Sequence, residues 1–399
     1  MAKDINPPRG MRDFLPLEKD KRESVLGVIR GVYSSFGFQE VETPALENLD
    51  RLTSGQGGDN EKLAYRVMKR GAELDSALED MSSVDALADL GLRFDLTVPL
   101  TRFYATNRNE LPSVFKAIQM GPVWRAERPQ KGRYRQFVQC DIDIIGDDSV
   151  LAEIELLNAS LAALDALGLN KAVIRVNHRE LLTSLLDGFG VKAEDRSSAM
   201  ITIDKLDKIE ATGVVSELRE RLGDEIADKA RAWLAKADTT VPEVLAPIFS
   251  AVAAGRLRFD PTLVRGMGYY TGTIFEIEMP GTGSAIGGGG RYDGMVGKWL
   301  GTDVPAVGIS IGFERVVELV DIQSQAAGVV LVLEDSSLEV INKAVAFQKQ
   351  LIDSGKAVRL EIKPRKLNLL LDSMFEAGFS QFALVSGGTT ELSFKDLGK

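Results

Sequence analysis

Cysteine and histidine are almost absent from this chain, which has one residue of each, Cys140 and His178, among 399. A single cysteine excludes an internal disulfide and any zinc cluster built on cysteine ligands. A single histidine excludes metal centres that need several imidazole ligands. We therefore expect any chemistry to depend on carboxylates and arginines, with hard metal ions where a metal is needed.

Long apolar runs are also missing, because no stretch approaches the ~20 residues that cross a bilayer. The first residues, MAKDINPPRGMRDFLP, lack the apolar core of a secretory signal. We expect a soluble protein that is not secreted and, given its lone cysteine, is cytoplasmic. The net charge of −10 argues against indiscriminate coating of nucleic acid, although it does not exclude a local basic surface.

Apolar spacing divides the chain into strand-rich and helix-rich parts. Strands are predicted in FGFQEVETPALEN, around a polar loop at 128–132, and again from LVRGMGYYTGTIFEIEM to AVGISIGFERVVELV. Between them, residues 179–256 carry almost only helical patterns, which indicates an insertion. From residue 326 onward, alternating strands and helices predict βαβ units with a small parallel sheet.

The segment WRAERPQKGRYRQF predicts a basic hairpin. With a period of two, Arg125 and Glu127 share one face of the first strand. Arg133 and Arg135 share one face of the second strand. Arginine binds phosphate oxygens with a bidentate fork, so the segment could hold phosphate. Charge pairs that solubilise an exposed hairpin explain it equally well. The basic residues of the segment are Arg125, Arg128, Lys131, Arg133 and Arg135.

Acidic residues lie on the predicted strands at positions where apolar neighbours predict burial. RFDLTVPL predicts a strand with Asp95 and Thr97 on one face. Asp141 and Asp143 share a face of another strand, after Gln139. Burying such groups costs free energy unless they are paired. A ligand amine or amide would pair them, and so would a local arginine.

Three further segments each allow two interpretations. GGGGRYDG, at 287–294, permits a ligand to approach the backbone because glycine has no Cβ, but it is neither a P-loop nor a dinucleotide fingerprint. A tight strand crossing explains it equally well. GFERV places Glu314 and Arg315 where a strand gives way to a helix, and a helix-capping charge is the simpler explanation. In LVRGMGYYTG, Arg265 either faces an anion or points to water.

Taken together and in this order, these segments resemble the histidyl-tRNA synthetases, a family of class II aminoacyl-tRNA synthetases. PPRGMRDFLP is similar to the N-terminal segment of the family, and GFQEVETPALE is similar to motif 1. VWRAERPQKGRYRQFVQCDIDIIG and AVGISIGFERV are similar to motifs 2 and 3. LVRGMGYYTGTIFE and IGGGGRYDG resemble the two histidine-specific motifs. The chain departs from the family at Gly268, where many members have aspartate, and in its short C-terminal block.

The resemblance implies an α+β fold whose catalytic domain contains a mostly antiparallel sheet, with a helical insertion and a C-terminal α/β anticodon-binding domain. The expected divisions are 1–178 and 257–325 for the two parts of the catalytic core, 179–256 for the insertion and 326–399 for the anticodon-binding domain. Motif 1 implies a homodimer. Lys363, Arg365 and Lys366 are candidates for phosphate contacts with tRNA.

The implied activity is ATP-dependent ligation of L-histidine to tRNA(His) through histidyl-adenylate, with Mg²⁺ on the phosphates. Arg265 and Arg125 are the implied catalytic residues. Those implied to bind ATP are Arg125, Glu127, Arg133, Phe137 and Arg315. Those implied to bind histidine are Asp95, Leu96, Thr97, Arg125, Gln139, Asp143, Arg265, Tyr269 and Tyr270.

The alternative is a non-catalytic synthetase paralogue that regulates ATP phosphoribosyltransferase in histidine biosynthesis. Proteins of that class usually lack the C-terminal domain and lose several residues of the catalytic face. This chain retains Arg125, Gln139, Arg265, Arg315 and the tyrosine pair, and it has a C-terminal α/β block. We therefore favour the enzyme.

Overall fold

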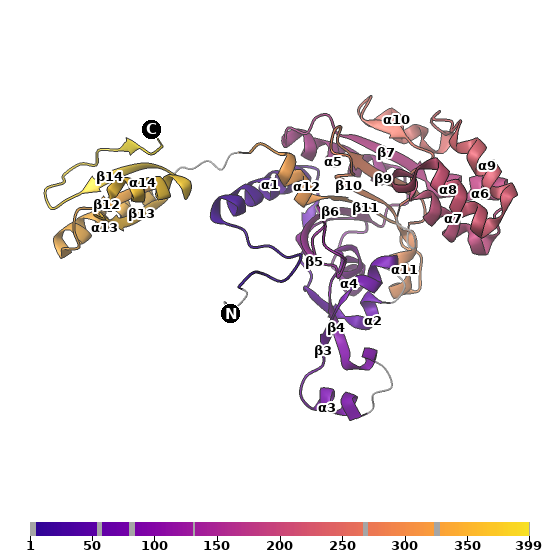
Figure 1. Cartoon of the computed structure of the whole chain (residues 1–399), viewed down its shortest axis with the longest axis horizontal. Coiled ribbons are helices and arrows are strands. Elements are labelled where there is room, and N and C mark those ends of the chain that lie inside the picture. The colour runs from indigo at the N-terminus through magenta and orange to yellow at the C-terminus, as the bar shows by residue number, and fades with distance from the viewer. Residues whose placement is uncertain are drawn as a thin grey trace. The chain divides into compact units, whose positions relative to one another are not determined.

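The structure is a computed structural model that describes residues 5–53, 58–79, 84–130, 132–265, 270–322 and 328–398. The chain forms two compact units (Figure 1). The first comprises Met1–Asp13 and Leu26–Val320, and the second comprises Phe14–Val25 and Asp321–Lys399.

An 8-stranded sheet forms the centre of the first unit, in the order β1-β5-β6-β11-β10-β9-β7-β8. The inner pairs are antiparallel, whereas the edge pairs, β1 with β5 and β7 with β8, are parallel. The mostly antiparallel sheet expected from the sequence is thus confirmed. Its strands are β1 (Gln39–Glu40), β5 (Phe115–Trp124), β6 (Gln136–Ile145), β7 (Val173–His178), β8 (Leu257–Phe259), β9 (Thr273–Glu278), β10 (Gly287–Arg291) and β11 (Ala306–Ile311).

The helix α5 (Leu151–Ala166) packs against β6 and β11. Its Leu156, Leu157 and Leu164 are fully buried, because nearly every turn of the helix carries leucine or alanine. Leucine and alanine also favour the helix itself. The other helices around this sheet are α4 (Thr97–Asn107), α11 (Asp293–Leu300) and α12 (Phe313–Leu319). The helix α1 (Pro16–Ser35) belongs to the second unit up to Val25 and to the first unit from Leu26.

A small antiparallel sheet with the order β2-β4-β3 lies in the first unit beside the large one. The segment FGFQEVETPALEN, predicted as one strand, is divided between β1 and β2. The break falls at Thr43 and Pro44, whose carbonyl oxygens accept from Arg93 Nη1 at 2.6 and 3.4 Å, and proline has no amide to donate to a neighbouring strand. The elements here are β2 (Leu46–Asn48), α2 (Leu49–Leu52), β3 (Tyr65–Met68), α3 (Ala72–Glu79) and β4 (Ala88–Leu92).

A block of helices follows β7 and ends before β8, which confirms the predicted helical content (Figure 1). Leu186, Val214 and Leu218 form its core together with Leu263 and Val264, which lie just before Arg265 in the chain. The limits proposed for a separate insertion, 179 and 256, stay a prediction. The helices are α6 (Arg179–Phe189), α7 (Arg196–Ile203), α8 (Leu206–Leu222), α9 (Asp224–Leu234) and α10 (Ala246–Ala251).

The second unit contains a sheet with the order β13-β12-β14-β15. The strands β12, β13 and β14 are parallel, as predicted, and β15 is antiparallel to β14. The two faces of β12 are both buried, one in each of two apolar clusters, which is usual for a parallel strand between helices. The elements are β12 (Gly328–Leu333), α13 (Leu338–Asp353), β13 (Val358–Ile362), α14 (Leu367–Glu376), β14 (Phe379–Val385) and β15 (Lys395–Asp396).

Four short 3-10 helices complete the described elements, at Gly58–Leu63, Val84–Leu87, Ala193–Asp195 and Glu243–Leu245. None of the helices in the described ranges is both long and apolar enough to cross a membrane.

Candidate functional site

One face of the large sheet carries a row of polar residues and glycine that runs across adjacent strands. Cross-strand pairing puts these positions level with one another, and side chains that are level on neighbouring strands share a face. A polar row in the middle of a sheet indicates a surface that meets a polar ligand. From β5 to β7 the row is Gln119, Asp141, Ser310, Gly288, Glu276 and Arg175.

Three buried carboxyl groups gather at the β6 end of this face: Asp95, Asp141 and Asp143, each 5% exposed or less. Burial raises the pKa of Asp95 to about 6 and that of Asp143 to about 7. Burial also raises the pKa of Asp141 well above its usual value, and the charge of Asp143 raises it further. A cationic ligand would relieve this repulsion, so the cluster is suited to an ammonium or imidazolium group.

Asp143 is held in place on one side only. Its Oδ1 accepts a hydrogen bond from the Tyr292 hydroxyl at 2.5 Å, whereas Oδ2 is buried without a partner among the described residues. Gly308, level with Asp143 on β11, makes room for this carboxylate, because a Cβ at 308 would lie 2.8 Å from Asp143 Cγ. Gln139 is similar, since its Nε2 is 3.3 Å from Asp141 Oδ2 and its Oε1 is buried without a partner in the described ranges.

The segment RFDLTVPL is not the strand that was predicted. The strand β4 ends at Leu92, and α4 begins at Thr97. The cause is local: Asp95 Oδ1 accepts from the backbone amide of Val98 at 3.1 Å, and such a side-chain bond favours a helix start over a strand. The Leu96 carbonyl in the same turn accepts from Gln119 Nε2 at 2.8 Å, and Gln119 is level with Asp141, so the turn with Leu96 and Thr97 lies beside the acidic cluster.

The hairpin β5–β6 is confirmed, but its connection is longer than predicted. The strands end at Trp124 and restart at Gln136, so Arg125, Glu127 and Arg133 lie in the connection and not on strand faces. This connection is held by its own polar contacts: Arg133 pairs with Glu127 at 3.3 Å, and the Arg135 amide donates to Gly10 O at 2.7 Å. Lys131 lies outside the described residues.

Arg125 connects the acidic cluster to the hairpin. Its Nε donates to the Phe94 carbonyl at 2.9 Å, next to Asp95, and its positive charge lowers the pKa of Asp95 against the effect of burial. Its guanidinium carbon is 5.0 Å from the centre of the Phe137 ring, at the edge of a cation–π contact. Arg125 therefore lies close to both Asp95 and Phe137, two residues that the resemblance assigns to the site.

Three arginines from separate segments are close enough to influence one another at the other end of the face. Burial lowers the pKa of Arg315, and the positive charges of Arg133 and Arg265 lower it further. Arg315, in the first turn of α12, also donates to the Ala285 carbonyl. Like charges held this close together destabilise the fold unless an anion binds among them. The cluster of arginines therefore indicates an anion site.

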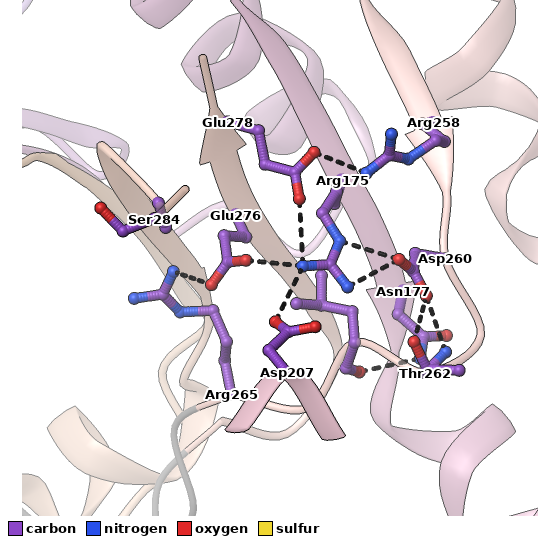
Figure 2. A network of polar contacts seen from close by, with 12 residues as sticks. Arg175, Asn177, Asp207, Arg258, Asp260, Thr262, Arg265, Glu276, Glu278 and Ser284 are labelled. Carbon is purple, nitrogen blue, oxygen red and sulfur yellow. Dashed lines mark hydrogen bonds and ion pairs between the residues drawn. The ribbon is translucent and has the colours of Figure 1, made fainter. Parts of the chain in front are cut away.

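Arg265 lies over the glycine strand β10. Its Nη1 donates to Glu276 Oε2 at 2.9 Å (Figure 2). The same nitrogen donates to the Gly287 carbonyl at 3.0 Å. A Cβ on Gly288 would lie 2.5 Å from the Arg265 guanidinium carbon. The predicted strand over LVRGMG does not form at Leu263–Arg265, which leaves this side chain free to cross the sheet.

Tyr270 packs against β10 one pleat away. Its ring would be 3.1 Å from a Cβ at Gly290, and it contacts both the apolar cluster of the helical block and the cluster that contains Tyr292. Thus β10 is a strand, as predicted, and side chains of this chain approach two of its glycines, Gly288 and Gly290. Tyr269 and Gly268 lie outside the described residues.

The sequence interpretation missed two residues that shape the site. The carboxylate of Glu276 contacts both Arg265 and Arg175. Nothing in the strand patterns around Glu276 and Arg175 had marked either of these two residues. Glu314, interpreted as a helix-capping charge, instead accepts from the Val138 amide at 3.1 Å and pairs with Arg12. The one available signal was burial, since an acid amid Phe and Ile in TIFEIE predicts a partner.

Comparison with known proteins gives one consistent result. A family model described as Histidyl-tRNA synthetase matches residues 10–316. A histidine–tRNA ligase of Leifsonia xyli subsp. xyli is 51% identical, over 98% of this chain and 97% of the relative. A probable histidine–tRNA ligase of Tropheryma whipplei is 40% identical over 95% of each chain.

Two solved structures are similar over nearly the whole chain. Histidyl-tRNA synthetase from Nostoc sp. PCC 7120 has a TM-score of 0.79 and 28% identity, and the match covers 98% of this chain and 95% of that one. A Bacillus halodurans protein described as an ATP phosphoribosyltransferase regulatory subunit/histidyl-tRNA synthetase has a TM-score of 0.73 and 19% identity, covering 97% and 99%. The second likeness shows the fold alone.

Proposed function

The chain belongs to the histidyl-tRNA synthetase family, and we propose on this basis that it ligates L-histidine to tRNA(His), with ATP as the second substrate. One observation carries the proposal at the level of the site. A single face of the sheet has three buried acids at one end and an arginine cluster at the other. A zwitterionic amino acid beside a triphosphate has the matching order of charges.

We assign the acidic end to histidine. Asp95 and Asp143 would pair with its ammonium group, the tyrosine pair would face its imidazole, and Gln139 would use its Oε1, which has no partner in the described ranges. Each charge-assisted hydrogen bond contributes about 1.5 to 3 kcal/mol net. The other residues proposed for this pocket are Leu96, Thr97, Tyr269 and Tyr270.

We assign the arginine end to ATP. Arg125 would hold the α-phosphate and Arg315 the γ-phosphate, with Arg133 close to the same anion. Glu127 would face the adenine amino group, and Phe137 would stack on the ring. Mg²⁺ would enter with ATP, whose phosphate oxygens are the hard ligands it prefers. When bound, it would spread the negative charge of the phosphates.

The proposed reaction needs no protein nucleophile. A carboxylate oxygen of histidine attacks the α-phosphorus, the bond from that phosphorus to the bridging oxygen of the β-phosphate breaks, and pyrophosphate leaves with the electron pair. Arg265 and Arg125 would stabilise the charge that develops at the α-phosphate, and the rest of catalysis is positioning. The 3′-terminal ribose of tRNA then takes the histidyl group and releases AMP.

Contacts with tRNA are proposed for two segments. The connection between β5 and β6 would face the acceptor end. In the second unit, the exposed side chains of Lys363, Arg365 and Lys366 lie in the loop between β13 and α14 and would contact anticodon phosphates. We also propose a homodimer through motif 1. A strict monomer in gel filtration would count against it.

The regulatory paralogue remains the second candidate, because the fold alone does not separate it from the enzyme. The two candidates differ in one measurement. Histidine-dependent exchange of pyrophosphate into ATP, followed by charging of tRNA(His), is expected of the purified protein. Absence of exchange with histidine, ATP and Mg²⁺ would favour the regulatory role.

A further inference from the structure

Glu276, on β9, divides its carboxylate between two arginines. Oε1 is 2.8 Å from Arg175 Nη1, and Oε2 is 2.9 Å from Arg265 Nη1 (Figure 2). The side chain is 18% exposed, so water screens both contacts weakly. Each oxygen therefore has one fixed cationic partner.

Arg175 is the more firmly held of the two arginines. Its side chain is 10% exposed, and its Nε and Nη2 lie 2.8 and 2.7 Å from Asp260 Oδ2. Asp260 is held in turn by Thr262, whose amide and hydroxyl donate to Oδ1 at 2.9 and 2.6 Å. Arg175 can thus anchor Glu276 from the side opposite Arg265.

Both contacts of Arg265 use the same nitrogen. Glu276 and the Gly287 carbonyl both accept from Nη1, which leaves Nε and Nη2 without a partner among the described residues. These two atoms form the edge of guanidinium that binds an anion in bidentate geometry. Within the described residues, Arg265 is therefore held through Nη1 alone, and Nε and Nη2 remain available to an anion.

Repulsion between Arg265 and Arg315 explains why the contact between Glu276 and Arg265 matters. Arg265 lies close enough to Arg315 to lower the pKa of the Arg315 guanidinium. Glu276 is the carboxylate paired directly with Arg265, and Asp204 is near enough to feel its charge; without Glu276, Arg265 would be held less firmly against the repulsion of the other cations. Donors fixed in advance at the developing charge stabilise a transition state more than mobile donors do.

We propose that Glu276 is a positioning residue for adenylate formation, which holds Arg265 toward the α-phosphate and is itself anchored by Arg175. This inference rests on the proposed function. Because Glu276 acts through Arg265 and not on substrate, its loss should lower kcat more than it raises either KM.

The test is a double-mutant cycle in histidine-dependent ATP–pyrophosphate exchange, with Glu276→Gln and Arg265→Ala. Glutamine keeps the length but has one acceptor oxygen in place of two. We expect E276Q to lower kcat by about tenfold or more, with KM changed less than about threefold. In the R265A background the same substitution should change kcat less than about twofold, because coupled residues are not additive.

Glu278→Gln is the matched control. Glu278 lies on the same face of β9 and contacts Arg175 at 3.2 Å and Arg258, but not Arg265, so its kcat should stay within about threefold of wild type. Thermal unfolding of each variant separates folding from positioning. Should E276Q fail to fold, Arg175→Lys carries the same test from the anchor side, with a kcat loss that disappears in R265A.

Three results would overturn the inference. Equal kcat values for E276Q and E278Q, or losses that multiply in the E276Q/R265A double variant, contradict it while the wild type exchanges normally and the proposed function stands. A wild type that shows no histidine-dependent exchange overturns the proposed function and this inference with it.

Discussion

Asp143 and Gly308 lie level on neighbouring strands, and the carboxylate of the first occupies the space that a side chain on the second would fill. The absence of a side chain at Gly308 therefore allows the Asp143 carboxylate to take this position. Because Tyr292 holds only one oxygen of Asp143, any displacement would be transmitted to the oxygen that has no partner within the described residues.

Gly308→Ala should displace Asp143 and weaken histidine binding. Losing one charge-assisted hydrogen bond, about 1.5 to 3 kcal/mol, corresponds to a rise of roughly ten- to a hundredfold in the KM for histidine. The KM for ATP should change far less. Gly294→Ala is the control, because nothing lies within 4 Å of a Cβ there. A G308A protein that folds and keeps the wild-type KM for histidine would show that Asp143 does not bind it.

Stability should fall with rising pH because of Asp143. Burial raises its pKa to about 7, so between about pH 4 and pH 7 the folded protein retains a proton that the unfolded chain has lost. The free energy of unfolding then decreases through this window, by up to about 1.4 kcal/mol per pH unit, and this contribution is constant above it.

Asp143→Asn should remove that part of the slope. Urea unfolding of the ligand-free protein between about pH 5 and pH 8 measures it. Asp148→Asn, at an exposed position on the same connection to α5, is the control and should keep the wild-type slope. Parallel slopes for wild type and D143N would mean that Asp143 is ionised in the folded protein throughout.

Arg265→Ala should lower the rate of adenylate formation by two to three orders of magnitude, in line with the ~3 to 4 kcal/mol lost when one preorganised donor is removed. Exchange of pyrophosphate into ATP measures this step without tRNA. Arg258→Ala is the control, since Arg258, on β8, is exposed and pairs with Glu278. Exchange by R265A within threefold of wild type would rule out the role.

Arg93→Met should destabilise the fold by about 2 to 4 kcal/mol, because it leaves buried carbonyls without a donor. Arg93 Nη1 donates to Thr43 O at 2.6 Å and Nε to Pro122 O at 3.0 Å, which joins the motif 1 segment to β5. Chemical denaturation measures the loss, and Arg108→Ala, at an exposed position, is the control. A loss below about 0.5 kcal/mol would contradict this account.

Local patterns predicted the parts of the fold that depend on neighbours in sequence. The hairpin β5–β6, the glycine strand β10 and the parallel strands of the second unit all follow from alternation and turn residues. The segment at Asp95–Thr97 was predicted wrongly, because one carboxylate that accepts from the Val98 amide converts a strand pattern into a helix start. Spacing alone does not contain that choice.

The sequence alone could not predict contacts between distant segments. Arg175 and Glu276 are 101 positions apart, and Asp143 and Tyr292 are 149 apart. Only strand order makes them neighbours, and strand order here depends on long connections. For Arg265, the residues left two roles open, and the resemblance to a family was needed to choose between them. The described geometry is compatible with the chosen role, since Arg265 lies across the sheet beside the other arginines.

The strand β10 illustrates how much a repetitive segment can specify. A Cβ at each of its first four positions would meet a different obstacle: the Ser310 carbonyl at 2.6 Å, the Arg265 guanidinium carbon at 2.5 Å, Ile309 Cα at 2.6 Å and the Thr273 carbonyl at 2.7 Å. Three of these four obstacles are backbone atoms of neighbouring strands, which cannot rotate aside. In a library randomised over GGGG and selected for activity, four consecutive codons should therefore return to glycine for four separate reasons.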